Sequence, residues 1–217
     1  MKIRYIIDKV ISPKLEALSW VDRYSGIVRT INIAMGNGTD KGIVKRYPVS
    51  CDLDSTDVDC ANTGFYQNLV PDDTKKSVVY WEMISPMSNA GMTKQKNFYV
   101  KKFKGTARLV VWLNLGNLGF QRCNDAFQLI PILEKEITTK AKLVGGDLDG
   151  SMIWIEPQRM VKQDINTVFG GYDYDKLKNY YLYPYDFFAM DVSFVLDQCL
   201  SKGGTYSAGS TFDCVNQ

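Results

Sequence analysis

Apolar positions near the start of the chain recur at the spacing of an amphipathic helix. They are Ile3, Ile6, Ile7, Val10, Ile11, Leu15 and Leu18. Residues three and four apart share one face of a helix, so this spacing predicts a helix over residues 3–18. Pro13 should kink or restart it, because proline lacks a backbone N–H and its ring clashes with the preceding turn. We therefore expect residues 1–26 to form an N-terminal helical segment.

Later segments alternate apolar and polar residues with period two or are rich in β-branched and aromatic residues, as is typical of strands. These predicted strands cover residues 27–35, 43–53, 77–84, 97–115, 151–161 and 188–196. Pro48 places the second of them on a sheet edge, because proline cannot donate to a ladder. The fourth is either one long strand or a bent pair broken at Gly105.

Two further helical stretches complete the predicted outline. Residues 124–141 form a helix with Asn124 as N-cap and Pro131 as an internal interruption. A short helical turn is expected around residues 177–181.

The sequence thus predicts an α+β fold, a single domain over residues 1–217. Its sheet is mixed and mostly antiparallel, with five or six strands packed against two or three helices. Residues 51–77 should form an extended acidic loop and residues 200–217 a weakly ordered tail.

The chain has no histidine, which removes the commonest general base and metal ligand. Its five cysteines are irregularly spaced without a CxxC pair, so we expect reduced thiols rather than a zinc site. The acidic stretch fails the EF-hand pattern, since Asp57 stands where glycine is needed and Thr63 where glutamate is needed. No phosphate-binding loop is present either. We expect no catalytic residue, cofactor or metal, and therefore no enzyme.

Charge is segregated along the chain, although the net charge is only +2. From Tyr47 to Thr74 there are six aspartates and no lysine or arginine, whereas residues 83–124 hold seven basic residues and no acidic one. An acidic surface of one copy could therefore meet a basic surface of the next, and head-to-tail contacts of this kind close into rings. The alternative is a basic face turned toward nucleic-acid phosphates. The charged interface candidates are Lys94, Lys96, Lys101, Lys102, Lys104, Asp52, Asp54, Asp57 and Asp59.

Residues 179–194, NYYLYPYDFFAMDVSF, contain seven aromatic residues. The second half has period two and predicts a core strand, with Asp191 on the opposite face. Tyr181, Tyr183 and Tyr185 at the strand's entry are then contact residues, because tyrosine buries area and keeps a hydrogen bond. The alternative is a stand-alone carbohydrate- or protein-binding module, with Tyr180, Tyr181, Tyr183 and Tyr185 as an aromatic platform. No apolar run approaches the ~20 residues that span a bilayer, so we expect no membrane partner.

Several segments resemble a known protein class. YDYDKLKNYYLYPYDFFAMDVSFVL resembles the closing segment of proteins at the head–tail junction of tailed bacteriophages. KRYPVSCDLD and NLVPDDTKKSVVYWE are similar to segments of ring proteins of crAss-like phages. The predicted order of elements also resembles tail-terminator and neck-ring proteins.

The resemblance implies a tail-terminator-like fold and a structural role in the virion, in a neck ring or head-to-tail connector. It implies a homo-oligomeric ring of six or twelve copies, beside other neck ring proteins, the portal or tail proteins, with non-specific DNA contact in its lumen. Such a protein is made in the host cytoplasm and ends in the virion, and the resemblance carries over no active-site residue.

Overall fold

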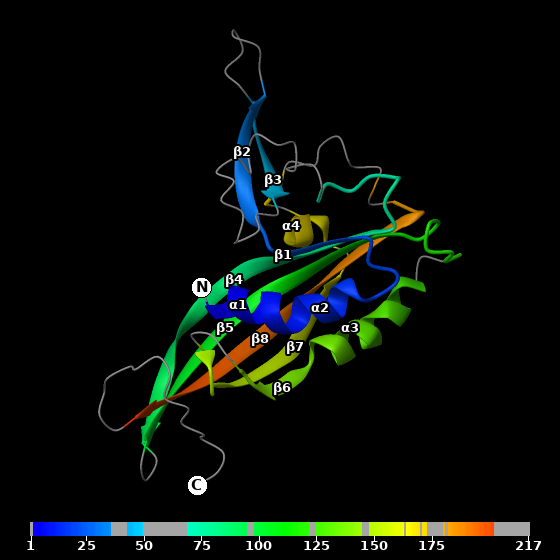
Figure 1. The fold of residues 1–217 in the computed structure, drawn as a ribbon. Coiled ribbons are helices and arrows are strands. Elements are labelled where there is room, and N and C mark those ends of the chain that lie inside the picture. The colour runs from blue at the N-terminus through cyan, green and yellow to red at the C-terminus, as the bar shows by residue number, and fades with distance from the viewer. Residues whose placement is uncertain are drawn as a thin grey trace.

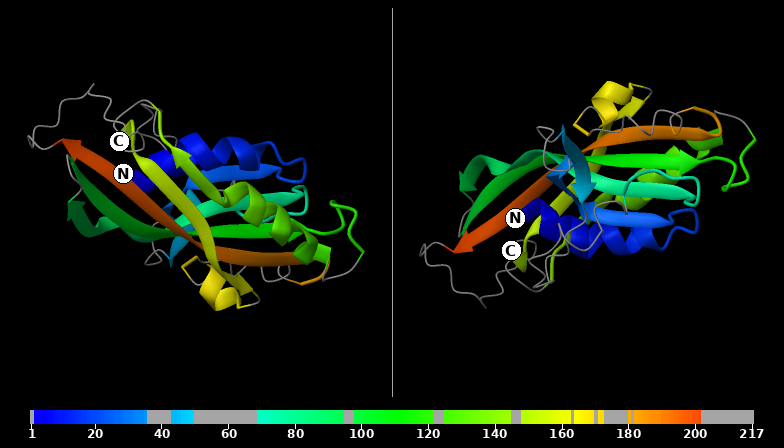
Figure 2. Two further views of the ribbon diagram at one scale, coloured as in Figure 1. Left: turned by 90° about the horizontal axis from the view of Figure 1, so that it is seen from below. Right: turned by 90° about the horizontal axis from the view of Figure 1, so that it is seen from above.

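The computed structural model describes residues 2–35, 43–49, 69–94, 98–121, 125–144, 148–162, 164–169, 171–172, 180 and 182–201. They form a single-domain α+β arrangement around one mixed six-stranded sheet, which curls into a half-barrel (Figures 1 and 2). Its strand order is β1 (Arg23–Ile27), β4 (Ser77–Lys94), β5 (Phe98–Asn114), β8 (Tyr185–Ser201), β7 (Met152–Lys162) and β6 (Thr139–Lys142). Only β1 and β4 pair in parallel, and every other neighbouring pair is antiparallel. The predicted fold class is confirmed.

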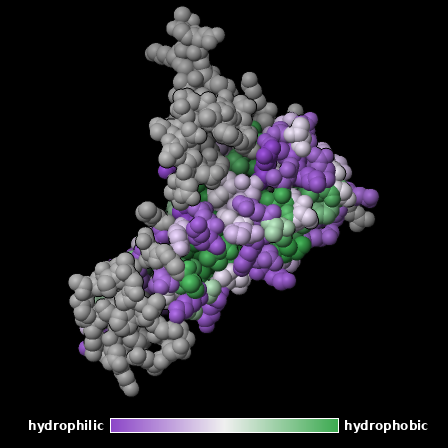
Figure 3. Space-filling model, in the orientation of Figure 1, coloured by the Kyte–Doolittle hydropathy of each residue, from purple (hydrophilic) through white to green (hydrophobic). Residues whose placement is uncertain are grey.

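The N-terminal helical segment contains α1 (Lys2–Ile6), a π-helical turn η1 (Ile7–Ile11) and α2 (Ser12–Glu16). The irregular turn ends just before Pro13, which occupies the first turn of α2, where a missing N–H costs nothing. The predicted restart at this proline is confirmed. The helical segment lies across the same side of the sheet as α3 (Ile130–Ile137) (Figure 1). Figure 3 shows this side, with polar side chains beside apolar ones.

The helix predicted over residues 124–141 is shorter than expected. A 3-10 turn, η3 (Asp125–Leu129), precedes α3, and Pro131 lies in the first turn of α3. The proline therefore begins the α-helix instead of interrupting it. Thr139–Lys142 leaves the helix and pairs with β7 as strand β6. The predicted N-cap, Asn124, lies outside the described residues.

Alternate residues of the central strands supply two apolar clusters, one on each face of the sheet. Leu109, Val111 and Leu113 of β5 face the helices, whereas Val110 and Trp112 face the other side. On the helix side, Phe194 of β8 is fully buried with its ring edge-on to Trp81, at 5.9 Å between ring centroids. The predicted core strand is therefore confirmed.

The second cluster is closed by an element that the sequence did not predict. Val168 and Phe169 of α4 (Ile165–Phe169) pack in this cluster, and the rings of Phe169 and Phe187 meet at 5.1 Å. Leu69 joins them from the segment before β4. Both faces of the sheet are thus covered at this end.

Strands β4 and β5 run far past this double-sided core and form a long hairpin, the β4–β5 arm. The predicted strand over residues 77–84 is only the first part of β4, whose 18 residues end at Lys94. The predicted segment 97–115 is one strand, β5, with Gly105 in its middle. Separately, β2 (Arg29–Met35) and β3 (Ile43–Val49) form a two-stranded antiparallel sheet (Figure 1), and Pro48 is on an edge as predicted.

Candidate interaction surfaces

The basic run of residues 94–108 begins at Lys94, the last residue of β4, and its residues on β5 are divided between the two faces of that strand. The ring of Phe103, on the helix side, carries Lys2 Nζ at 3.3 Å and Lys101 Nζ at 5.2 Å from its centroid. Lys102 and Lys104 point to the opposite face, because successive side chains of a strand alternate. The predicted basic patch is therefore divided between two faces of the sheet, with Lys102 and Lys104 on one face and Lys101 on the other.

Two neighbouring rows of side chains cross four strands on that opposite face. Residues directly paired across strands share a face, so the register defines each row. The first row is Lys104, Val195, Trp154 and Lys140, and the second is Lys102, Asp197, Met152 and Lys142. Each row begins and ends with an exposed lysine. We call this surface the four-lysine face.

The four-lysine face is hollowed between β5 and β7. A depression of about 280 Å³ is lined by Lys102, Lys104, Trp154, Glu156, Ser193, Val195 and Asp197. Lys102 Nζ lies 3.9 Å from the Asp197 carboxylate, and Lys140 Nζ lies 6.0 Å from the centre of the Trp154 ring. The Lys102 side chain is 46% exposed in this pair, whereas the Asp197 side chain is only 19% exposed.

An ion pair bounds this face on the side of the second apolar cluster. Arg108 donates to both carboxylate oxygens of Asp191, through Nε at 2.6 Å and Nη2 at 3.1 Å, and through Nη1 to the Thr167 carbonyl at 3.0 Å. The hydrogen bond to Asp191 raises the pKa of Arg108. Arg108 is thus bound within the chain.

Glu82 of β4 lies beside this pair. Burial raises the pKa of Glu82, although a hydrogen bond from Tyr172 and the charge of Arg108 act in the opposite direction. Glu82, Arg108 and Asp191 therefore form a row of charged side chains. This row separates the second apolar cluster from the four-lysine face on the same side of the sheet.

The outer edge of the β4–β5 arm is the second candidate surface. β1 pairs with β4 only as far as Trp81, whose carbonyl also accepts a hydrogen bond from the Val28 N–H at 2.9 Å. Beyond it, from Met83 to Lys94, no strand of the described part of the chain pairs with this edge. Every side chain there is exposed except the half-buried Met87, and none before Lys94 is charged. Ile84 is 49% exposed and Met92 61%.

Two tyrosines of the predicted aromatic platform, Tyr180 and Tyr185, pack against each other and against Trp112. The Tyr185 ring stacks on Trp112 at 5.4 Å, and Tyr180 meets Trp112 edge-on at 6.3 Å. Trp112 Nε1 also donates to the Tyr180 carbonyl at 2.7 Å. Tyr183 is 60% exposed, and Tyr181 lies outside the described residues. Tyr180 and Tyr185 therefore line the second apolar cluster.

All four acidic candidates lie outside the described residues, namely Asp52, Asp54, Asp57 and Asp59, as does Lys96. The proposed contact between them and the basic run stays a prediction. Within the described ranges, no group of three or more His, Cys, Asp or Glu side chains is placed to share a metal ion.

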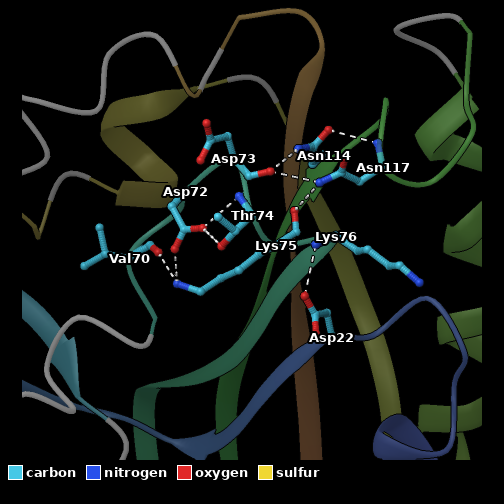
Figure 4. A network of polar contacts seen from close by, with 9 residues as sticks. All are labelled: Asp22, Val70, Asp72, Asp73, Thr74, Lys75, Lys76, Asn114 and Asn117. Atoms are coloured by element: carbon cyan, nitrogen blue, oxygen red, sulfur yellow. Dashed lines mark hydrogen bonds and ion pairs between the residues drawn. The ribbon is translucent and has the colours of Figure 1, made fainter.

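The last two aspartates of the acidic stretch hold the start of β4 in place (Figure 4). Asp72 pairs with Lys75, which donates to the Val70 carbonyl at 2.9 Å. Partial burial opposes the charge on Asp72, but hydrogen bonds from Lys75 and Thr74 outweigh it and lower its pKa. The Asp73 carbonyl accepts from the Asn117 side chain at 2.9 Å. These contacts are internal to the chain.

The sequence predicts the lysines of β5 as interface residues, but it does not predict the four-lysine face or the exposed edge of the β4–β5 arm. The face depends on pairing between strands that are far apart in sequence, so no local pattern contains it. None of the helices in the described part of the chain is long and apolar enough to cross a membrane. No protein-family model, curated protein or solved structure matches this chain.

Proposed function

We propose that this protein is a structural subunit that assembles through its β4–β5 arm into a closed ring. One observation carries the proposal, namely the exposed and uncharged outer edge of β4 from Met83 to Thr93. Such an edge presents backbone N–H and C=O groups that another chain can pair with. Natural monomers usually protect long edges with charged side chains, proline or bulges.

This edge has only part of that protection. Pro86 and shifts of register between Met83 and Gly91 make it irregular, but no charge appears before Lys94. Partner contacts along it would therefore combine short stretches of backbone pairing with burial of Ile84 and Met92. When the partner is a different surface of an identical subunit, the contact repeats, and it closes into a ring if the rotation from one subunit to the next closes.

We assign this ring to the head–tail junction of a tailed bacteriophage, as a neck ring, connector or tail terminator. The assignment is supported by the segments at residues 45–54, 68–82 and 172–196, which resemble junction proteins of these viruses. Neighbouring ring, portal or tail proteins would then be the partners at its two faces, and the virion its location.

The double variant Ile84→Lys/Met92→Lys tests the proposal. Two charges on the edge should prevent strand pairing but leave the fold intact, because both side chains are exposed in the single chain. Mass photometry should give multiple copies for the wild type and a monomer for the variant. The matched control Gln128→Lys/Asn166→Lys adds the same charge at exposed positions of η3 and α4 and should assemble normally.

Circular dichroism of each variant separates lost assembly from lost folding. Normal assembly of a folded Ile84→Lys/Met92→Lys variant would overturn the proposed edge contact. A wild-type chain that stays monomeric and binds glycans would instead support the stand-alone binding module.

A further inference from the structure

The depression of about 280 Å³ on the four-lysine face is a trough between strands with long side chains. Its floor is β8, which contributes three short side chains to this face, those of Ser193, Val195 and Asp197. The walls stand on β5 and β7, two strand spacings or roughly 9.5 Å apart. They are formed by Lys102 and Lys104 on one side and by Trp154 and Glu156 on the other. We call this depression the β8 trough.

Several polar groups that line the β8 trough are not engaged within the chain. The side chains of Lys104, Glu156 and Ser193 make no hydrogen bond or ion pair with any described residue. Lys102 Nζ and Asp197 Oδ1 are 3.9 Å apart, which is longer than a hydrogen bond. The trough therefore offers donors and acceptors together, and a ligand with several hydroxyl groups can satisfy both kinds.

The charges that line the β8 trough balance each other, because two lysines stand with two carboxylates. A ligand with a strong charge of either sign would meet a like charge within the trough, and such contacts oppose binding. The lining therefore favours a ligand that is polar but uncharged.

Trp154 gives the β8 trough one apolar wall. Its indole is half-buried, and no other described aromatic ring packs against it. Lys140 Nζ lies 6.0 Å from the centre of the ring and stands on β6, on the far side of β7 from the trough. The side of the indole toward β8 is therefore open to a ligand.

We propose that the β8 trough binds a neutral saccharide. A pyranose ring has apolar C–H bonds on its faces and hydroxyl groups around its rim, so one face can pack on Trp154. The rim hydroxyls would donate to Glu156 and Asp197 and accept from Lys104. The volume lies just below the roughly 300–1,000 Å³ of typical ligand pockets, so it suits a single sugar ring of a longer chain. This inference does not depend on ring assembly.

The test is calorimetric titration of the full chain with three neutral hexasaccharides, namely maltohexaose, cellohexaose and chitohexaose. At least one should bind. Its affinity should change less than about twofold between about 50 mM and about 500 mM salt, because an uncharged ligand releases no counterions. Sorbitol has hydroxyl groups but no ring with an apolar face, and it should not compete.

Two variants test the walls of the β8 trough. Trp154→Ala should weaken binding at least about tenfold, because it removes the apolar wall. Lys104→Met/Glu156→Gln keeps the net charge and should also weaken binding about tenfold, because hydrogen bonds to charged groups are lost. The matched control Lys135→Met/Glu134→Gln makes the same changes at exposed positions of α3 and should keep the wild-type affinity.

Tryptophan emission supplies a local readout. Trp81 and Trp112 are fully buried, and Trp20 packs against the helix-side core. A change in emission on adding the hexasaccharide should therefore come from Trp154. It should disappear in Trp154→Phe, which keeps an aromatic wall and should keep most of the affinity.

Three results would overturn the proposal. The first is a folded wild-type chain that binds none of the three hexasaccharides. The second is hexasaccharide binding that is as strong in Trp154→Ala as in the wild type, which would place the sugar elsewhere. The third is tighter binding of oligo-dT or poly-glutamate than of any hexasaccharide, lost in Trp154→Ala, which would indicate an anionic partner. Melting curves of all variants confirm that folded chains are compared.

Discussion

At the scale of single residues, the boundary between the second apolar cluster and the four-lysine face is made of charged groups. The side chains of Arg108 and Asp191 are only 14% and 18% exposed, and they form two hydrogen bonds with each other. Loss of the Asp191 charge would leave the Arg108 guanidinium buried without its partner, which typically costs more than losing a surface pair. The alternation of residues in β8 correctly predicted that Asp191 faces away from the helix-side core. It did not predict the pair of Asp191 with Arg108.

Glu82 beside this pair gives a prediction about pH. Burial raises its pKa in the folded chain, so folding favours the protonated form. The stability linked to this group is complete below the ordinary glutamate pKa of 4.5 and is lost as pH rises through the raised value. Glu82→Gln removes the buried charge and keeps an acceptor for Tyr172. The variant should therefore be more stable than the wild type at pH 7.

Thermal melting of both proteins between pH 4 and pH 8 checks this prediction. The advantage of Glu82→Gln should shrink as pH falls toward 4.5. A variant that is less stable than the wild type at pH 7 would show that the attraction to Arg108 exceeds the cost of burial.

At the scale of elements, β5 passes closely beneath the N-terminal helical segment at Gly105. A Cβ at this position would lie 2.6 Å from Ile3 Cδ1 and 3.0 Å from both the Ser85 carbonyl oxygen and the Met87 nitrogen. The two backbone atoms belong to the irregular part of β4, so an added methyl group has no space on that side. Glycine is needed here for close packing of helix, strand and arm.

Gly105→Ala should therefore destabilise the fold by about 1–3 kcal/mol through overpacking. Chemical denaturation measures the change. The matched control is Gly171→Ala, where an added Cβ meets nothing within 4 Å and the effect should stay within about 0.5 kcal/mol. Equal stability of both variants would mean that Ile3 and β4 can shift without cost.

Sequence patterns at the element scale predicted what depends on local periodicity. The β8 core strand and the edge position of Pro48 are confirmed by the structure. The N-terminal segment is helical over residues 2–16, but the end of the segment predicted to be helical is strand β1. Local sequence patterns did not predict the elements whose structure depends on pairing between strands. The second half of β4 is rich in small and polar residues without alternation, and it becomes a strand because β5 pairs with it. Similarly, α4 has only five residues, too few for a helical period to show.

At the scale of the whole molecule, helices cover one side of the half-barrel, and the described residues cover the other side only at one end. The described chain therefore offers two separate surfaces, the arm edge and the four-lysine face. They differ in chemistry, since the edge is uncharged as far as Thr93 and the face is basic. We expect the edge to join subunits, and the Ile84→Lys/Met92→Lys variant with its matched control tests this expectation.

Electron microscopy of the purified full-length chain tests the central claim most directly. The account predicts closed rings of six or twelve copies, in which the edge of β4 from Met83 to Lys94 is buried between neighbouring subunits. Class averages also show where the β4–β5 arm lies in the assembly, and they require no ligand. A chain that remains monomeric in such images at every concentration tested, with the β4 edge open to solvent, would contradict it.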